Sequence, residues 1–147
     1  MTRRPTHRDV TVLLGAACVG MLVLTACAGR PAASAAAGTA SAFYSAIGSS
    51  DGAAACGLLT PAARHTLESD ADESCDEAVL GGDVGTTLEE RADPRPASTV
   101  SVAGREAQVV LSTDVVFLTI TGSTWRITAV GCDPRPQRPY RCVVEGS

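Results

Sequence analysis

Four cysteines beyond the amino-terminal region are the residues whose types and spacing best suit covalent chemistry. They are Cys56, Cys75, Cys132 and Cys142. Four thiols allow three pairings, and we favour the local one, which joins Cys56 to Cys75 and Cys132 to Cys142. Loops of these sizes would contribute roughly 3 kcal/mol each in the chain-entropy model. Zinc is the competing use, but metal sites favour Cys-x-x-Cys knuckles, which neither pair forms. We therefore expect two disulfides and no metal.

Two residues, His65 and Asp114, are candidates for acid–base catalysis. His65 lies in AARHTLES, where a half-exposed surface position is the simpler interpretation. Asp114 follows Thr113 ahead of an apolar run, a place where aspartate is usually a turn residue. The sequence has no Ser-His-Asp order, no Gly-x-Ser-x-Gly elbow and no glycine-rich phosphate loop. We therefore predict no catalytic residue and no cofactor.

Charged clusters offer two further candidates. The acidic run 68–77 suggests calcium, but an EF-hand needs glycine at position six, and counting from Asp70 places Cys75 there. A solvated helix start is the preferred interpretation. The tail arginines are a candidate basic patch for an acidic partner, although a proline-spaced solvent loop is simpler; they are Arg135, Arg138 and Arg141.

Phe43, Phe117 and Trp125 are three of the five aromatic residues in the chain. If helices pack on a sheet, these side chains are candidates for the lining of a ligand pocket. Packing in an ordinary core is the default alternative.

The charge of the chain limits its partners. The formal net charge is −4, and removal of residues 1–26 would take away three arginines and one aspartate, leaving −6. An acidic domain repels phosphate backbones, so we expect no nucleic-acid partner. It also gains nothing from an anionic membrane surface, so any membrane attachment must be hydrophobic.

The first 26 residues have the pattern of an export signal. Residues 1–9 hold three arginines, and residues 10–26 are apolar apart from two threonines. A charged start followed by a short apolar region and small residues is typical of a signal peptide, whereas a membrane anchor needs about 20 apolar residues. An even number of cysteines in an exported chain favours disulfides.

The residues at the end of this segment, LTAC, resemble the lipobox of bacterial lipoproteins. The resemblance implies that Cys27 receives a diacylglycerol and becomes the new amino terminus. Because one acyl chain binds a bilayer only marginally and two hold it stably, this would tie the protein to the membrane. An ordinary signal peptide that leaves Cys27 as a free thiol is the alternative. Residues 27–38 are then a lipidated cysteine and a flexible tether, since AGRPAASAAAG lacks a periodic apolar face.

Residues 39–147 form the expected single globular domain. Helices are predicted near 39–47, over 52–59, from Pro61 with Thr60 as its N-cap, and as a short segment that Gly81 ends. The segment 81–97 is the likeliest exposed connection.

From about residue 97 the apolar period changes to two. Four alternating runs, separated by turn residues at 104–105, 112–114 and 122–123, predict an antiparallel meander with one buried face. The proline-rich tail 133–146 is expected to be a loop clipped by Cys132 and Cys142, with CVVE as an edge strand. Helices first and strands later give an α+β fold.

Three segments together resemble a group of exported actinobacterial lipoproteins of the NTF2-like (SnoaL-like) superfamily. They are AFYSAIGSSDGAAACGLLTPAAR, DVVFLTITGSTWRITAVGC and RPYRCVVEG. The resemblance implies helices packed on the concave side of a curved antiparallel sheet, a cone. No strand is predicted between the helices, so the chain would carry a reduced version of that fold.

These features favour a lipid-anchored protein on the outer face of the cell membrane, without enzymatic activity, that binds a protein or small molecule of unknown identity. One alternative is a small-molecule enzyme of the SnoaL type that uses His65 or Asp114. Another is an accessory regulator of a membrane protein, which predicts an exposed apolar patch on the sheet.

Overall fold

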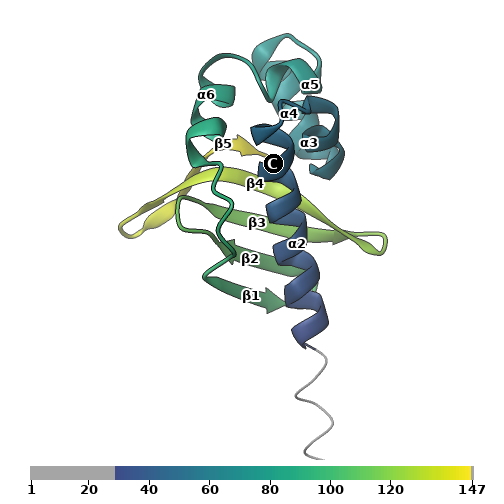
Figure 1. Cartoon of the computed structure of the whole chain (residues 1–147), viewed down its shortest axis with the longest axis vertical. Helices are drawn as coiled ribbons and strands as arrows, with labels where there is room; N and C mark the ends of the chain where they lie inside the picture. The colour runs from purple at the N-terminus through teal and green to yellow at the C-terminus, as the bar shows by residue number, and fades with distance from the viewer. Residues whose placement is uncertain (1–28, 147) are drawn as a thin grey trace, which may run out of the picture. The chain divides into compact units, whose positions relative to one another are not determined.

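A computed structural model describes residues 29–146, and these form helices followed by an antiparallel sheet (Figure 1). The sheet and its core lie within residues 32–147, which form one compact unit. The α+β class predicted from the sequence is confirmed. The elements are α2 (Gly29–Gly48), α3 (Gly52–Leu58), α4 (Pro61–Ala71), α5 (Cys75–Ala78), α6 (Gly82–Arg91), β1 (Thr99–Ala103), β2 (Glu106–Val110), β3 (Val115–Thr121), β4 (Thr124–Arg135) and β5 (Arg138–Glu145).

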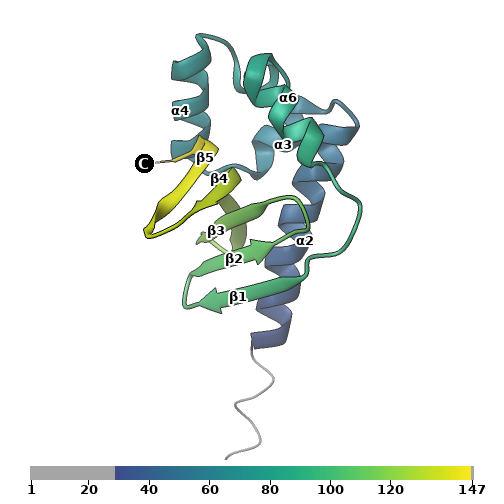
Figure 2. The same cartoon turned by 90° about the vertical axis from the view of Figure 1, so that its left-hand side faces the viewer.

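Helix α2 is longer than the sequence pattern suggested. The residues from 29 to 38, expected as a flexible tether, are its first half, and Ala36 and Ala40 are fully buried. Alanine is the strongest helix former, and it supplies enough apolar surface to pack although it gives a weak periodic signal. From Ala32 onward the helix lies across one face of the sheet (Figure 2). Its residues Phe43 and Ile47 are buried in the core.

Helices α3 and α4 each begin after a residue whose side chain caps the first turn. Asp51 accepts a hydrogen bond from the Ala54 amide at 2.9 Å, and Thr60 accepts one from the Ala63 amide at 3.2 Å. Pro61 occupies the first helical turn, as predicted. The expected short fourth helix is α5, which is only four residues long and is tied to α3 by the Cys56–Cys75 disulfide.

Helix α6 occupies a segment that was expected to be an exposed connection. Gly81 and Gly82 do not end a helix but precede and begin one, and only residues 92–98 form the connection to β1. Gly85 is buried against Leu80, whose carbonyl oxygen lies 2.1 Å from where a Cβ would be. The absence of that Cβ lets α6 approach the chain closely enough for Leu88 to enter the core.

The sheet is the predicted meander, because each strand pairs antiparallel with the next in the order β1-β2-β3-β4-β5. The alternating residues share one face: Val100 lies opposite Val109, and Leu118 lies opposite Ile127. Val109, Leu118 and Ile127 are fully buried. No helix within residues 29–146 combines the length and hydrophobicity needed to cross a membrane.

The tail is a β-hairpin and not a loop. Strand β4 continues to Arg135 and β5 returns from Arg138, with a tight turn in which Gln137 has a φ of 57°. Pro139 is tolerated because β5 is an edge strand, where a missing N–H need not break a ladder. Cys132 and Cys142 lie directly opposite each other and are joined by the second disulfide.

Candidate functional site

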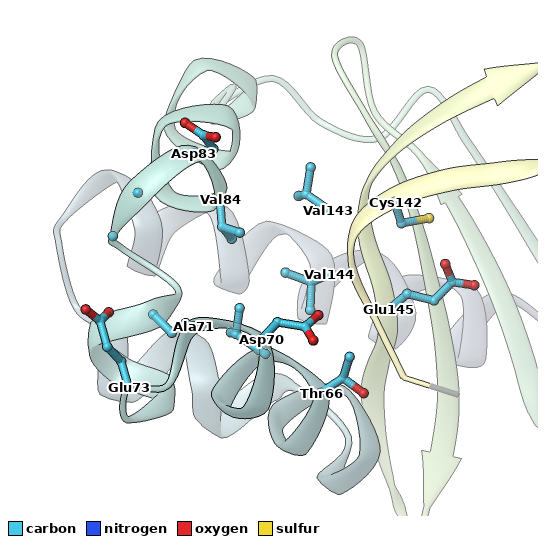
Figure 3. A pocket seen from close by; sticks show the side chains of 14 residues that line it. Thr66, Asp70, Ala71, Glu73, Asp83, Val84, Cys142, Val143, Val144 and Glu145 are labelled. Atoms are coloured by element: carbon cyan, nitrogen blue, oxygen red, sulfur yellow. The ribbon is translucent and has the colours of Figure 1, made fainter.

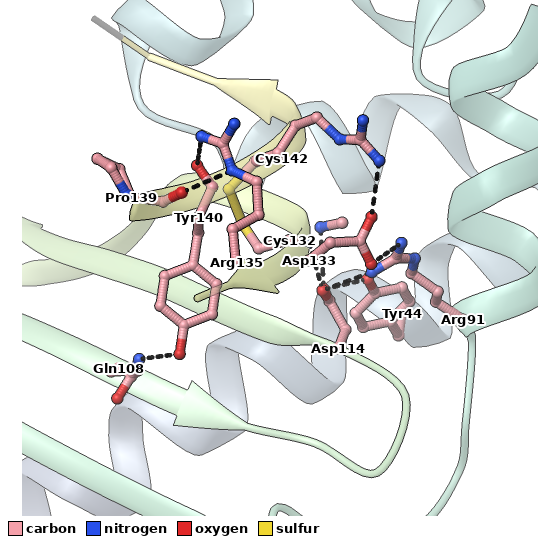
Figure 4. The surroundings of a disulfide bond; sticks show 12 residues. Tyr44, Arg91, Gln108, Asp114, Cys132, Asp133, Arg135, Pro139, Tyr140 and Cys142 are labelled. Carbon is pink, nitrogen blue, oxygen red and sulfur yellow. Dashed lines mark hydrogen bonds and ion pairs between the residues drawn. A yellow bond between two sulfur atoms is a disulfide. The ribbon is translucent and has the colours of Figure 1, made fainter. Parts of the chain in front are cut away.

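Asp114, at the start of β3, is a buried carboxylate surrounded by donors (Figure 4). Its Oδ1 accepts a hydrogen bond from the Cys132 amide at 2.6 Å, and its Oδ2 accepts bonds from the Gly131 amide at 2.9 Å and the Tyr44 hydroxyl at 2.5 Å. Arg91 Nη1 lies 3.4 Å from Oδ1. Each of the two carboxylate oxygens of Asp114 thus accepts hydrogen bonds from two donors of the protein.

Arg91 connects this carboxylate to the hairpin. Its Nη2 lies 2.8 Å from Asp133 Oδ1, and the exposed Arg141 lies 3.7 Å from the other oxygen of Asp133. Partial burial lowers the pKa of Arg91, but the hydrogen bond to Asp133 and the two neighbouring carboxylates raise that pKa above its ordinary value. Burial raises the pKa of the Tyr44 hydroxyl, and the charge of Asp114 raises it further. The network therefore keeps Asp114 paired with Arg91 and Tyr44 protonated.

This arrangement joins three elements around Asp114. Tyr44 comes from α2, Arg91 from the end of α6, and the two amides from β4. His65, the other candidate acid–base residue, is exposed on α4. In the part of the chain that the structure describes, no hydrogen bond or ion pair joins His65 to Asp114.

The three candidate pocket aromatics do not meet at one cavity. Phe43 is fully buried and Trp125 is 6 % exposed, both in the core beneath α2. Phe117 is one residue out of phase with the buried Val116 and Leu118, so its side chain lies on the other face of β3. There its ring contacts Tyr140 edge to face, at 5.1 Å between centroids.

A groove of about 410 Å³ lies between α4, the α5–α6 junction and β5 (Figure 3). This size is within the range of ligand pockets. Its floor is apolar and includes Leu67, Val84, Val143 and Val144. Its rim carries four carboxylates, Asp70, Glu73, Asp83 and Glu145. We call this site, defined by these eight residues, the acid-rimmed groove.

The charge of the groove has one sign. No arginine or histidine lines it, and residues 66–90 as a whole contain nine carboxylates and no basic side chain. Figure 3 shows Asp70, Glu73 and Asp83 on the helical side of the groove, and the Glu145 side chain on the side of β5 away from Val143 and Val144. No group of three or more metal-ligating side chains converges among the described residues. The groove therefore suits a ligand with several spread positive charges better than a single ion.

One wall of the groove is the free edge of the sheet. Strand β5 is an edge strand, and Cys142 to Glu145 line the groove. Because β5 pairs with β4 alone among the described strands, every second residue of β5 directs its N–H and C=O away from β4, at the edge that borders the groove.

Sequence reasoning did not find this groove. The acidic run was interpreted as a solvated helix start, and Asp70 and Glu73 are indeed exposed. The signal that was available is the absence of basic residues over 66–90. Nothing in the local pattern shows that β5, some 70 residues away along the chain, lies against that run.

No family model matches the chain, and neither the curated proteins nor the solved structures contain a match to it.

Proposed function

We propose that this chain is an exported lipoprotein, anchored to the outer face of the cell membrane through Cys27, whose domain is a non-enzymatic binding module. Cys27 and the signal segment lie outside the described residues, so the anchoring rests on the LTAC pattern and the apolar run before it. The two disulfides support the proposal, because such bonds persist in oxidising compartments outside the cytoplasm.

The acid-rimmed groove is the observation that carries the binding role. It combines an apolar floor with charged groups at its rim, the composition that small binding sites share. The buried Asp114, in contrast, has its donors already in place within the fold and offers no vacant position to a substrate. Binding at the groove is therefore better supported than catalysis at Asp114.

We also propose that the domain is a reduced relative of the NTF2-like cone found in actinobacterial lipoproteins. A long first helix lying across an antiparallel meander supports this relationship. The helices α2 to α6 follow one another without an intervening strand, which is the sense in which the fold is reduced.

The anchoring is tested by replacing the lipidation cysteine. Cys27→Ala is expected to move most of the protein from the membrane fraction to the medium, or to stall it as the uncleaved precursor, because the two acyl chains that hold it are lost. Immunoblots of fractionated cells and the intact mass of the protein measure both effects. Cys18→Ala, a change inside the apolar run, is the matched control and should leave fractionation unaltered. Equal membrane retention of the Cys27→Ala protein at mature size would contradict lipidation.

A further inference from the structure

The free edge of β5 and the charge of the groove beside it together define a partner. We propose that the acid-rimmed groove binds an extended, positively charged polypeptide segment of a partner protein, which adds to β5 as a sixth strand. This inference rests on the proposed binding function and specifies its ligand.

Strand addition needs unpaired backbone groups that are accessible from a groove. As an edge strand, β5 directs the N–H and C=O groups of every second residue away from β4. Among residues 29–146, no backbone hydrogen bond joins β5 to α4 or to α6, although both helices flank it. The helices therefore form walls that leave this edge available, and an incoming strand would gain ladder hydrogen bonds there.

The carboxylates of the rim favour a positively charged incoming strand. Asp70 and Glu73 belong to the end of α4 and the turn after it, Asp83 to the first turn of α6, and Glu145 to the end of β5. A ligand lying along β5 passes between these carboxylates, which no basic side chain of the lining neutralises. Like-charged segments are repelled, so the rim selects cationic partners.

The apolar floor of the groove favours a strand in which apolar and basic side chains alternate. Successive side chains of an extended segment point to opposite sides. Apolar side chains at every second position can cover Leu67 and Val84, while the arginines or lysines between them reach the rim. The expected ligand is therefore a segment in which basic and apolar residues alternate.

A peptide binding measurement on the full-length protein, purified from membranes in detergent, tests the charge requirement. The probe is a fluorescein-labelled peptide of about eight residues with alternating arginine and valine, a typical strand length, read by fluorescence anisotropy. The variant Asp70→Asn/Asp83→Asn/Glu145→Gln is expected to bind it about tenfold more weakly, because it loses the ion pairs that these carboxylates make with the arginines of the peptide. Glu89→Gln/Glu90→Gln/Glu106→Gln removes the same net charge outside the groove and should bind nearly as the unaltered protein does. Equal weakening by both variants would mean that general attraction, not the groove, holds the peptide.

Modification of the peptide tests strand addition without altering the protein. Methylation of alternate backbone nitrogens removes the N–H groups of one edge but keeps every charge, and it should weaken binding by at least about tenfold, the loss of roughly one or two hydrogen bonds. Undiminished binding of the methylated peptide overturns strand addition.

Two further results would each overturn the proposal. If light scattering shows self-association that the groove variant abolishes, the occupant is a second copy, whose arginine-bearing β4–β5 hairpin enters the groove. If the peptide fails to bind at any concentration, the ligand class is wrong. Neither result bears on anchoring, because the fractionation of the Cys27→Ala protein is measured without the peptide.

Discussion

Asp114 shows how much a single residue can hold together when its carboxylate is fully buried. Its partners come from α2, α6 and β4, and two of them are backbone amides of β4. Asp114→Ala is expected to lower the free energy of unfolding by about 3 kcal/mol, because buried donors lose their acceptor and Arg91 loses a partner. Tyr44→Phe removes one donor and should cost about 1 to 2 kcal/mol.

Urea denaturation followed by Trp125 fluorescence measures both effects. Asp133→Asn is the control, since its carboxylate is about half exposed and an exposed ion pair is worth at most about 1 kcal/mol. If Asp114→Ala cost no more than Asp133→Asn, Asp114 would not be the centre of the network.

The sequence indicated Asp114 as a turn residue or a catalytic candidate, and not as the buried centre of a hydrogen-bond network. Its position after Thr113 does follow a turn signal, but its burial depends on Tyr44, 70 residues earlier, and on Gly131 and Cys132, 17 and 18 residues later. Patterns over a few residues carry no information about partners at such separations. Thr60 was predicted correctly as an N-cap because its partner, the Ala63 amide, lies only three residues along the chain.

At the scale of the element, the β4–β5 hairpin depends on one glycine. Gly131 has a φ of 70°, its amide serves Asp114, and a Cβ there would lie 2.2 Å from Val143 Cγ2. Gly131→Ala is expected to destabilise the fold by roughly 2 to 4 kcal/mol, from the left-handed backbone and the overlap together.

A second glycine separates these two causes. Gly104 has a similar φ of 62° but has open space where a Cβ would lie, so Gly104→Ala should cost only about 1 kcal/mol. Thermal and urea unfolding of the two variants compare them directly. Equal costs would show that the backbone angle alone matters and that Val143 yields without penalty.

Elements were predictable where one local signal dominated. The alternation of Val109 or Leu118 with polar neighbours has only one interpretation, so the strands were found close to their observed ends. Helix α6 was missed because Gly81 and Gly82 usually terminate helices, whereas here tertiary packing of Leu88 favours a start. The tail hairpin was missed because prolines are compatible with a strand mainly at an edge or at a bulge. Pro139 lies on the edge strand β5 and Pro134 lies at the register shift in β4, and both positions are properties of the whole sheet.

At the scale of the molecule, connectivity explains what was predictable. Each strand pairs with its neighbour in sequence, so local signals were enough to give the meander. The acid-rimmed groove brings α4 and α6 against β5, and its existence depends on contacts between distant segments. Its acidic residues could be read from the sequence, but their arrangement around a strand edge could not.

The two disulfides divide the domain between them, and each should be worth a similar amount. Cys56–Cys75 closes a loop across α3 to α5, while Cys132–Cys142 closes the hairpin, with separations of 19 and 10 residues. In the chain-entropy model each contributes about 3 kcal/mol, the longer loop slightly more. We expect each double variant to lower Tm by roughly 10 to 15 °C for a domain of this size, measured by calorimetry without reductant; the variants are Cys56→Ser/Cys75→Ser and Cys132→Ser/Cys142→Ser.

Thiol titration of the unaltered protein in denaturant should detect neither pair until a reductant is added. Four reactive thiols at once, or double variants that melt with the unaltered protein, would show that the bonds do not form in the native protein and would remove the support they give to an oxidising location.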